Sequence, residues 1–287
     1  MKNIIKFKEQ GFCFGVSRSI AIVEKTLFNE NTKKPIYLLG HLVHNKHVND
    51  YFTSKGVIVL NNKTRLEMLD LVNEGTVIIT AHGVSSKVIE KAKTKGLDIV
   101  DATCPYVTKT VNVIKEKVKE GYHLAYIGKV GHPEVETIID EIENVTIIEE
   151  NKELSEIPNK KCILAHQTTL SDYDVKSTLE KVMNKYPHVE LLEQICMFPE
   201  KRQQEINTYC FPNGKNLGIV VGDRMSNNAT KLKELLERRK LDKVVMINDV
   251  RELELINTNS FDNIFIASGT STPINIVENI YKKLRGE

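Results

Sequence analysis

Short apolar runs rich in β-branched residues alternate along the chain with longer segments in which apolar residues recur at helical spacing. Val16, Ile20, Val23 and Leu27, for example, follow one another at steps of four, three and four residues, which places them on one face of a helix. Repeated alternation of strands and helices is typical of α/β proteins whose parallel sheets are covered on both faces. The predicted strands are Ile4–Phe7, Ile36–Leu39, Val57–Leu60, Val77–Thr80, Ile99–Ala102, Leu124–Ile127, Val145–Glu149, Ile163–Ala165, Leu191–Ile195, Leu217–Val221, Val244–Ile247 and Ile264–Ala267.

Three of the five cysteines divide the chain into nearly equal parts. Cys13, Cys104 and Cys196 are 91 and 92 residues apart, and 91 residues follow the last of them. Each lies where a predicted strand gives way to a predicted helix, whereas Cys162 and Cys210 have no such setting. The spacing and the shared context therefore predict three related units of about 90 residues.

The expected fold is α/β, with three pseudo-symmetric lobes around a central cavity, each a small, mostly parallel sheet with flanking helices. Once the N-terminal strand is set aside, the predicted strands number four, four and three. The strand within residues 3–7 is therefore predicted to complete the third lobe. The predicted lobes span residues 1–103, 104–195 and 196–287.

Each of the three matched cysteines follows a strand, and ligands of open α/β sheets bind at the carboxyl ends of strands. Three lobes around one axis would bring the three thiols together. Three thiolates without a fourth indicate either an iron–sulfur cluster with one open iron or a zinc ion with one open position. Pro105 follows Cys104, as it often follows cluster ligands. The alternative is that these are ordinary buried cysteines.

Histidines also follow predicted strands, in the segments GHLVHNKHV, TAHGVSS and GHPEVE. His41, His44 and His47 are spaced like a metal-binding helix face, but no acidic co-ligand lies between them. We therefore favour one functional histidine with solvent-exposed neighbours in that segment, together with His82 and His132. The remaining histidines are predicted to be structural: His123, His166 and His188.

The segment His132–Pro133–Glu134 is the sharpest local signal outside the cysteines. Pro133 favours the first turn of a helix, which places Glu134 at the positive end of the helix dipole. In a closed apolar cavity, a carboxyl group there can serve as an acid near neutral pH. The commoner role for such a residue is a charge–dipole interaction alone.

Loops rich in hydroxyl and amide groups follow three other predicted strands. Such residues cap helices, but a helix N-terminus can also bind phosphate through its free N–H groups. The chain contains neither GxxxxGK[ST] nor GxGxxG, so the expected ligand is a small phosphorylated metabolite and not a nucleotide. The loop residues are Thr168, Thr169, Ser171, Ser226, Asn227, Asn228, Thr230, Ser268, Thr270, Ser271 and Thr272.

Composition narrows the class of protein. The chain has 287 residues, of which 41% are apolar, and 40 basic residues nearly balance 38 acidic ones. This balance indicates neither a nucleic-acid partner nor a membrane surface. No apolar run reaches the length of a membrane span or a signal peptide. With an odd number of cysteines as well, the expected location is cytoplasmic, with reduced thiols.

The motifs GFCFGV, VHN, AHGVS, DATCP, GHPEVE, QTTLS, IC…RQ and VVG…SNN occur in this order between Gly11 and Ser271. Together they resemble the 4-hydroxy-3-methylbut-2-enyl diphosphate reductases, the LytB-type iron–sulfur reductases of the non-mevalonate isoprenoid pathway. The resemblance covers nearly the whole chain. It implies an enzyme that reductively removes the hydroxyl group of its diphosphate substrate to give isopentenyl and dimethylallyl diphosphate.

The resemblance also implies roles for individual residues. One [4Fe-4S] cluster would be held by Cys13, Cys104 and Cys196, and a ferredoxin or flavodoxin would supply electrons. Glu134 would donate protons, assisted by His132 and Thr168. Asn227 stands where the family commonly has a second serine, and the loop of Ser271 also departs from the family pattern. The implied substrate-binding residues are His44, His82, His132, Thr168, Ser226, Asn227, Asn228 and Ser271.

Other classes of protein remain as alternatives. A different three-lobed [4Fe-4S] enzyme, such as quinolinate synthase, also uses three cysteines and an open iron, but the phosphate-type loops and the GHPE motif argue against it. A cluster-bearing redox protein without enzymatic activity needs no phosphate site. A zinc hydrolase is the remaining alternative, and an iron-free protein would favour it.

Overall fold

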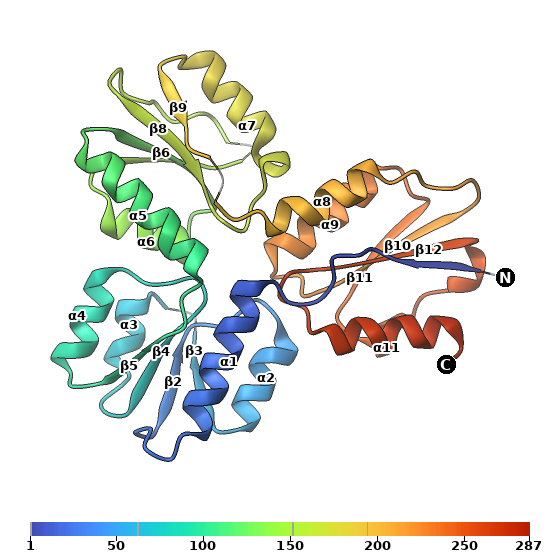
Figure 1. Cartoon of the computed structure of the whole chain (residues 1–287), viewed down its shortest axis with the longest axis horizontal. Coiled ribbons are helices and arrows are strands. Elements are labelled where there is room, and N and C mark those ends of the chain that lie inside the picture. Colours follow the sequence, from blue (N-terminus) through green and yellow to red (C-terminus); the bar gives the residue numbers. More distant parts are fainter. Residues whose placement is uncertain (1, 62, 151, 194) are drawn as a thin grey trace. The chain divides into compact units, whose positions relative to one another are not determined.

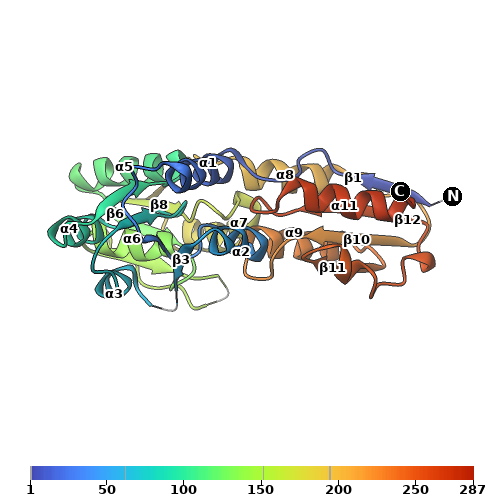
Figure 2. The ribbon, with the colours of Figure 1, turned by 90° about the horizontal axis from the view of Figure 1, so that it is seen from below.

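A computed structural model describes residues 2–61, 63–150, 152–193 and 195–287. These residues form three parallel four-stranded sheets with flanking helices (Figures 1 and 2), which confirms the predicted fold class. Among the described residues, no helix combines the length and apolar character needed to cross a bilayer.

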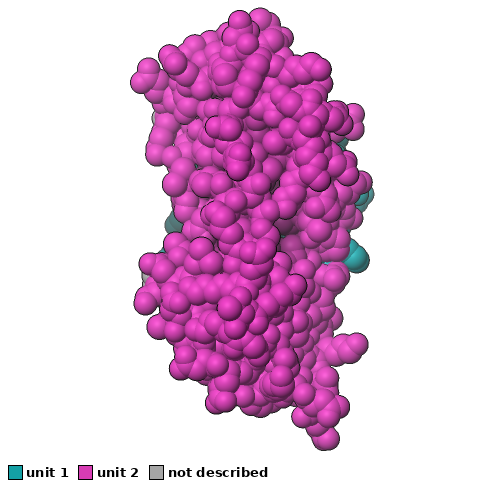
Figure 3. All heavy atoms as spheres, turned by 90° about the vertical axis from the view of Figure 1, so that its left-hand side faces the viewer, with its two compact units in different colours: residues 1–16, 44–48, 197–287 teal, residues 17–43, 49–196 magenta. Residues whose placement is uncertain are grey.

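The chain divides into two compact units (Figure 3), which are described separately below. The first unit contains one sheet, and the second contains the other two. The two boundaries predicted between the three lobes, at residues 103/104 and 195/196, stay a prediction. The first unit comprises residues 1–16, 44–48 and 197–287, and the second comprises residues 17–43 and 49–196.

The sheet of the first unit is buried on both faces. Along β10, Leu217 and Ile219 pack with α10 and α11, while Val220 packs on the other face with α8 and α9. This alternation follows from the two-residue repeat of a strand. The strand order is β11 (Lys243–Ile247), β10 (Asn216–Val221), β12 (Asn263–Ser268) and β1 (Asn3–Lys6); the helices are α8 (Phe198–Thr208), α9 (Asn227–Arg238), α10 (Val250–Leu253) and α11 (Ile274–Arg285).

The second unit holds the sheets of the N-terminal and central thirds of the chain. In the N-terminal sheet, α3 and α4 cover one face by packing on Leu39 and Val77. The strand order is β3 (Val57–Leu60), β2 (Ile36–Leu39), β4 (Thr76–Ile79) and β5 (Asp98–Asp101). The helices of this part of the chain are α1 (Phe14–Phe28), α2 (Lys46–Ser54), α3 (Arg65–Asp70) and α4 (Ser86–Thr94).

The central sheet is covered on both faces. Leu124 and Tyr126 of β6 pack with α5 and α6, while Ala125 and Ile127 pack with α7 on the other face. The strand order is β7 (Val145–Ile148), β6 (His123–Ile127), β8 (Cys162–His166) and β9 (Val189–Leu191); the helices are α5 (Pro105–Lys119), α6 (Pro133–Glu141) and α7 (Asp172–Lys185).

The three sheets share one topology. In each, the second strand along the chain lies at one edge, followed in space by the first, the third and the fourth. In the first unit the fourth position is taken by the N-terminal strand β1, which pairs in parallel with β12. The sheets are thus topological repeats, and the last repeat uses a strand from the opposite end of the chain.

Every predicted strand overlaps an observed one, and the largest difference concerns β9. We predicted Leu191–Ile195, but β9 spans Val189–Leu191; residue 194 lies outside the described residues. Val189 is the residue that enters the core, whereas Leu191 is 47% exposed. The apolar run used for the prediction therefore lies mostly in the connection between β9 and Cys196, beyond the end of the strand.

Close packing follows β10. A Cβ atom added at Gly222 would lie 2.7 Å from Ala229 Cβ in α9, a short backbone-anchored side chain that cannot rotate away. We expect Gly222→Ala to lower the free energy of unfolding by about 1–3 kcal/mol through overpacking. Denaturant unfolding measures this effect. In the double variant Gly222→Ala/Ala229→Gly the clash is relieved, so its loss of stability should be smaller than the sum of the losses in the two single variants. Strictly additive losses would contradict the packing argument.

Candidate active site

Candidate functional residues follow the two central strands of each sheet. In each sheet the first and third strands are neighbours, and the second and fourth strands lie on opposite sides of this pair. Open α/β sheets bind ligands at such a switch point, beyond the carboxyl ends of the strands. In the second unit β4 leads to His82, β6 to His132 and β8 to Thr168. In the first unit β10 leads to Ser226 and β12 to Ser271.

The three matched cysteines follow the fourth strand of each sheet, namely β1, β5 and β9. All five cysteines of the chain are described, and none forms a disulfide bond. Cys13 directly precedes α1, Cys104 caps α5, and Cys196 lies two residues before α8. A helix N-terminus favours a thiolate, because the dipole end is positive. The three thiols thus occupy equivalent places in three repeats.

Each of these cysteines also adjoins the loop that follows the third strand of its own sheet. The Cys13 N–H donates to the Thr270 carbonyl (3.0 Å), next to Ser271, and the Cys104 N–H donates to the Ala81 carbonyl (2.9 Å), next to His82. Cys196 and Thr168 line one small cavity in the second unit. In every repeat a thiol is therefore placed beside a candidate substrate-binding residue.

Glu134 is a buried carboxyl group, 3% exposed, in the first turn of α6. The Thr168 N–H donates to its Oε2 atom, and the Thr168 hydroxyl lies 2.9 Å from both carboxylate oxygens. Two donors and the helix dipole therefore hold this carboxyl group in one orientation. Because Thr168 also lines the cavity with Cys196, the acid is held by a residue that faces a thiol.

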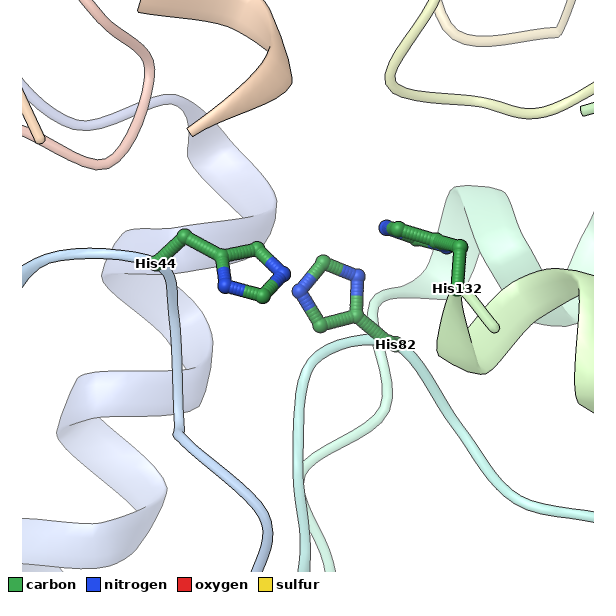
Figure 4. Close-up of side chains that lie close together, drawn as sticks. All are labelled: His44, His82 and His132. Carbon is green, nitrogen blue, oxygen red and sulfur yellow. The ribbon is translucent and has the colours of Figure 1, made fainter. Parts of the chain in front are cut away.

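Two buried histidines, His82 and His132, adjoin Glu134, and Figure 4 shows their side chains. The rings of His82 and His132 meet edge to face, with their centroids 5.0 Å apart, and His82 Nδ1 lies 3.6 Å from Glu134 Oε1. His132 caps α6, with its Nδ1 accepting from the Glu134 N–H (3.2 Å). In the neutral ring the proton is then on Nε2, which makes that atom a donor. The pair can therefore bind an anion or pass a proton to Glu134.

Contacts between the two sheets of the second unit fix helix α6. Arg65 pairs with Glu136 (3.3 Å), and the Ser85 hydroxyl donates to Asp140 (2.9 Å). Burial lowers the pKa of Arg65, and Glu136 opposes this shift. Arg65, in α3, and Ser85, the N-cap of α4, thus hold the helix that carries Glu134 next to the His82 loop.

His44 belongs to the first unit, on a segment tied to that sheet. The Ser271 hydroxyl donates to the His44 carbonyl (3.1 Å), and the Lys46 N–H donates to Asp223 (3.0 Å). His47 lies 3.7 Å from Asp249. A hydrogen bond from Arg251 is the largest of the effects that lower the pKa of Asp249 to about 2. His47 is thus an anchoring neighbour, which leaves the half-buried His44 as the functional candidate of this segment.

The loops after β10 and β12 form a second polar cluster in the first unit. Asn228 is 3% exposed, and its Oδ1 accepts from the Thr270 N–H (2.9 Å). This hydrogen bond fixes the orientation of the side-chain amide and leaves Nδ2 as its donor. Nδ2 is buried and has no hydrogen-bond partner among the described residues. An unpaired buried donor is costly, and an anion would satisfy it. Ser226, which caps α9, lies 3.5 Å from Ser271, whereas Asn227 is only half-buried.

Several residues that contribute to the site were not singled out by the sequence. Asp223 anchors the His44 segment, and Arg65 holds α6. His166, predicted to be structural, is buried and lines the cavity of Cys196 and Thr168. Position in the sequence could have indicated two of them, since His166 ends the central strand β8 and Asp223 closely follows the central strand β10. Nothing local marks Arg65, whose partner is 71 positions away.

Thr168→Val tests the support of the buried carboxyl group. The change removes the hydroxyl that donates to Glu134 while keeping the shape of the side chain. We expect the free energy of unfolding to fall by about 1–3 kcal/mol, since a buried acceptor loses a hydrogen-bond partner. Thr169→Val is the matched control: the Thr169 hydroxyl accepts from the neutral Gln167 side chain, so a smaller loss is expected. An equal loss in both variants, in denaturant unfolding, would count against the Glu134 contact.

The fold and the site define a three-sheet α/β enzyme with an acid–histidine site and thiols at equivalent strand ends. Residues 4–285 match the family model described as LytB protein, and the chain belongs to this family. It is 41% identical over 281 residues to a protein of Anoxybacillus flavithermus, covering 97% of this chain and 89% of that relative. It is 40% identical over 285 residues to a protein of Bacillus subtilis, covering 98% and 90%. Both relatives are named 4-hydroxy-3-methylbut-2-enyl diphosphate reductase.

Solved structures agree with this assignment. A structure of E-1-hydroxy-2-methyl-but-2-enyl-4-diphosphate reductase from Plasmodium falciparum has a TM-score of 0.85 and 33% identity, covering 99% of this chain and 87% of that one. A structure of (E)-4-hydroxy-3-methyl-but-2-enyl diphosphate reductase, described as the terminal enzyme of the non-mevalonate pathway, has a TM-score of 0.69 and 26% identity, covering both chains fully. The resemblance seen in the sequence is confirmed.

Proposed function

We propose that this chain reductively removes the hydroxyl group of (E)-4-hydroxy-3-methylbut-2-enyl diphosphate to give isopentenyl and dimethylallyl diphosphate. Family membership and the names of the relatives support this function over a quinolinate synthase-like enzyme or a redox protein without enzymatic activity. The observation that carries the proposal is the buried Glu134 carboxyl group, held by Thr168 in the same cavity wall as Cys196.

The donor set fits an iron–sulfur cluster. Three thiols occupy equivalent strand ends next to helix N-termini, and no disulfide bond consumes them. Cys13, Cys104 and Cys196 would hold one [4Fe-4S] cluster, the inference on which the reductive chemistry depends. When bound, this group supplies electrons singly and a Lewis acid for the substrate hydroxyl. A ferredoxin or flavodoxin is the proposed electron donor.

The substrate diphosphate would be held by imidazole, hydroxyl and amide donors. His82 and His132 provide imidazole donors in the second unit, and His44, Ser226, Asn228 and Ser271 provide donors in the first. The buried Asn228 Nδ2 supports this role most directly, because it lacks a partner among the described residues. Asn227 is the weakest member of the set, since it is only half-buried. Diphosphate binding would fix the reacting alcohol in place.

Glu134 would give protons to the departing hydroxyl and to the carbon skeleton. Its Oε atoms accept hydrogen bonds from Thr168, so the carboxyl group keeps one orientation through the reaction. His82, whose Nδ1 lies 3.6 Å from Glu134 Oε1, would return protons to Glu134, and His132 would assist it through the adjoining ring of His82. Because the proposed chemistry needs reduced thiols, the cytosol is the predicted location.

Anaerobically prepared, iron-loaded protein tests the function. Its absorption spectrum should change when the diphosphate is added, and a low-potential electron donor should then drive formation of both isoprenoid diphosphates. Protein that holds the cluster but neither responds to the diphosphate nor converts it would overturn the proposal. Conversion of a quinolinate precursor, or a colourless zinc protein, would favour the alternatives.

A further inference from the structure

A buried arginine lies behind the Cys13 loop of the first unit. Arg202, in α8, is 5% exposed. Among the described residues, no carboxylate lies within ion-pair distance of it, and its hydrogen-bond partners are neutral oxygens of Ser268 and Gly11. A buried cation is costly unless negative charge compensates it, so this position calls for an anionic neighbour.

The hydrogen bonds of Arg202 direct it toward the cysteine loop. Its Nη2 donates to the Gly11 carbonyl (2.6 Å), and its Nη1 donates to the Ser268 carbonyl (2.5 Å). The Gly11 N–H in turn donates to the Ser268 hydroxyl (2.9 Å). The guanidinium therefore joins the loop before Cys13 to the end of β12.

Electrostatics point to the same neighbour. Burial lowers the pKa of Arg202. Two negative charges oppose this shift, of which Cys13 has the larger effect and Glu9 the smaller. Glu9 is exposed to solvent, which screens its charge. Cys13 is thus the main source of negative charge near this arginine when its sulfur ligates a metal group.

We propose that Arg202 compensates the charge of the cluster bound through Cys13 and makes that cluster easier to reduce. This inference rests on the proposed function, because it assumes an anionic cluster at the three cysteines. Each added electron makes the cluster more negative, and a fixed positive charge nearby favours the reduced state. Arg202 acts through Cys13 and its loop, as a positioning residue.

Midpoint potentials of anaerobically reconstituted variants test this role. In Arg202→Gln we expect the one-electron reduction equilibrium to become roughly tenfold less favourable, a fall of about 59 mV in potential. Arg202→Lys keeps the charge and should stay near the wild-type value. Arg224→Gln is the matched control, because Arg224 is an exposed arginine of the same unit, and it should leave the potential unchanged.

The outcomes separate this inference from the proposed function. Wild-type protein without a cluster would contradict the function itself. A cluster-bearing Arg202→Gln protein with the wild-type potential, or an equal fall in Arg202→Lys, would overturn the role of the charge. If Arg202→Gln folds but loses its cluster while Arg202→Lys retains it, charge compensation is supported. If neither variant folds, geometry and not charge is what the position requires, and the inference fails.

Discussion

Replacing Glu134 by glutamine should lower turnover of the diphosphate by about 10²–10⁴-fold, the range that a well-placed general acid supplies. Glutamine keeps the size of the side chain and can still accept from the Thr168 N–H. It cannot donate a proton in the manner of a carboxylic acid. Turnover should therefore fall while the cluster content and the spectral response to the diphosphate stay close to those of the wild type.

The matched control is Glu143→Gln. Glu143 lies just beyond the end of α6 and is exposed, so the same chemical change there should leave turnover within about twofold of the wild type, as is usual for exposed sites. Steady-state assays with a saturating low-potential electron donor make the comparison. Near-normal turnover in Glu134→Gln would remove Glu134 from the proton-donating role.

The fold was predictable because its determinants are local and repeated. Apolar residues recur with the period of a strand or helix because one side of each element is buried against its neighbours, as along β6 and β10. The cysteine spacing separately indicated three repeats. The sequence could also assign the N-terminal strand to the last sheet, since the last third lacked a fourth strand. It could not predict the two compact units, because these depend on contacts such as that of Lys46 with Asp223, 177 positions apart.

The candidate site was predictable where one short segment carries the signal. Pro133 begins α6, so the place of Glu134 at a helix N-terminus followed from adjacent residues. The contact of Glu134 with Thr168 spans 34 positions. It depends on the pairing of β6 with β8, which places the ends of these two strands side by side. Arg202 lies within the IC…RQ motif, but its contact with the Gly11 carbonyl could not be predicted, because the two residues are 191 positions apart.

Cluster loss in the cysteine variants is the second large effect expected. Cys13→Ser, Cys104→Ser and Cys196→Ser each remove a thiolate from an equivalent strand end, and a serine hydroxyl is a poor substitute at neutral pH. Without three protein ligands the cluster should be lost or become labile, and turnover should fall with it. Because the three positions are equivalent in the repeats, we expect comparable losses from all three variants.

The remaining two cysteines provide the controls within the same chain. Burial raises the pKa of the Cys162 thiol, so Cys162 remains protonated in the core of the central sheet, where it packs with Ala125 and Leu164. Cys210 is exposed and follows the end of α8. Cys162→Ala and Cys210→Ser should therefore keep the wild-type iron and sulfide content, about four of each per chain. Iron and sulfide analysis of all five anaerobically prepared variants decides the matter. Equal iron and sulfide contents in all five variants would refute the three-ligand assignment. Loss of iron and sulfide in Cys210→Ser would instead make Cys210 a cluster ligand.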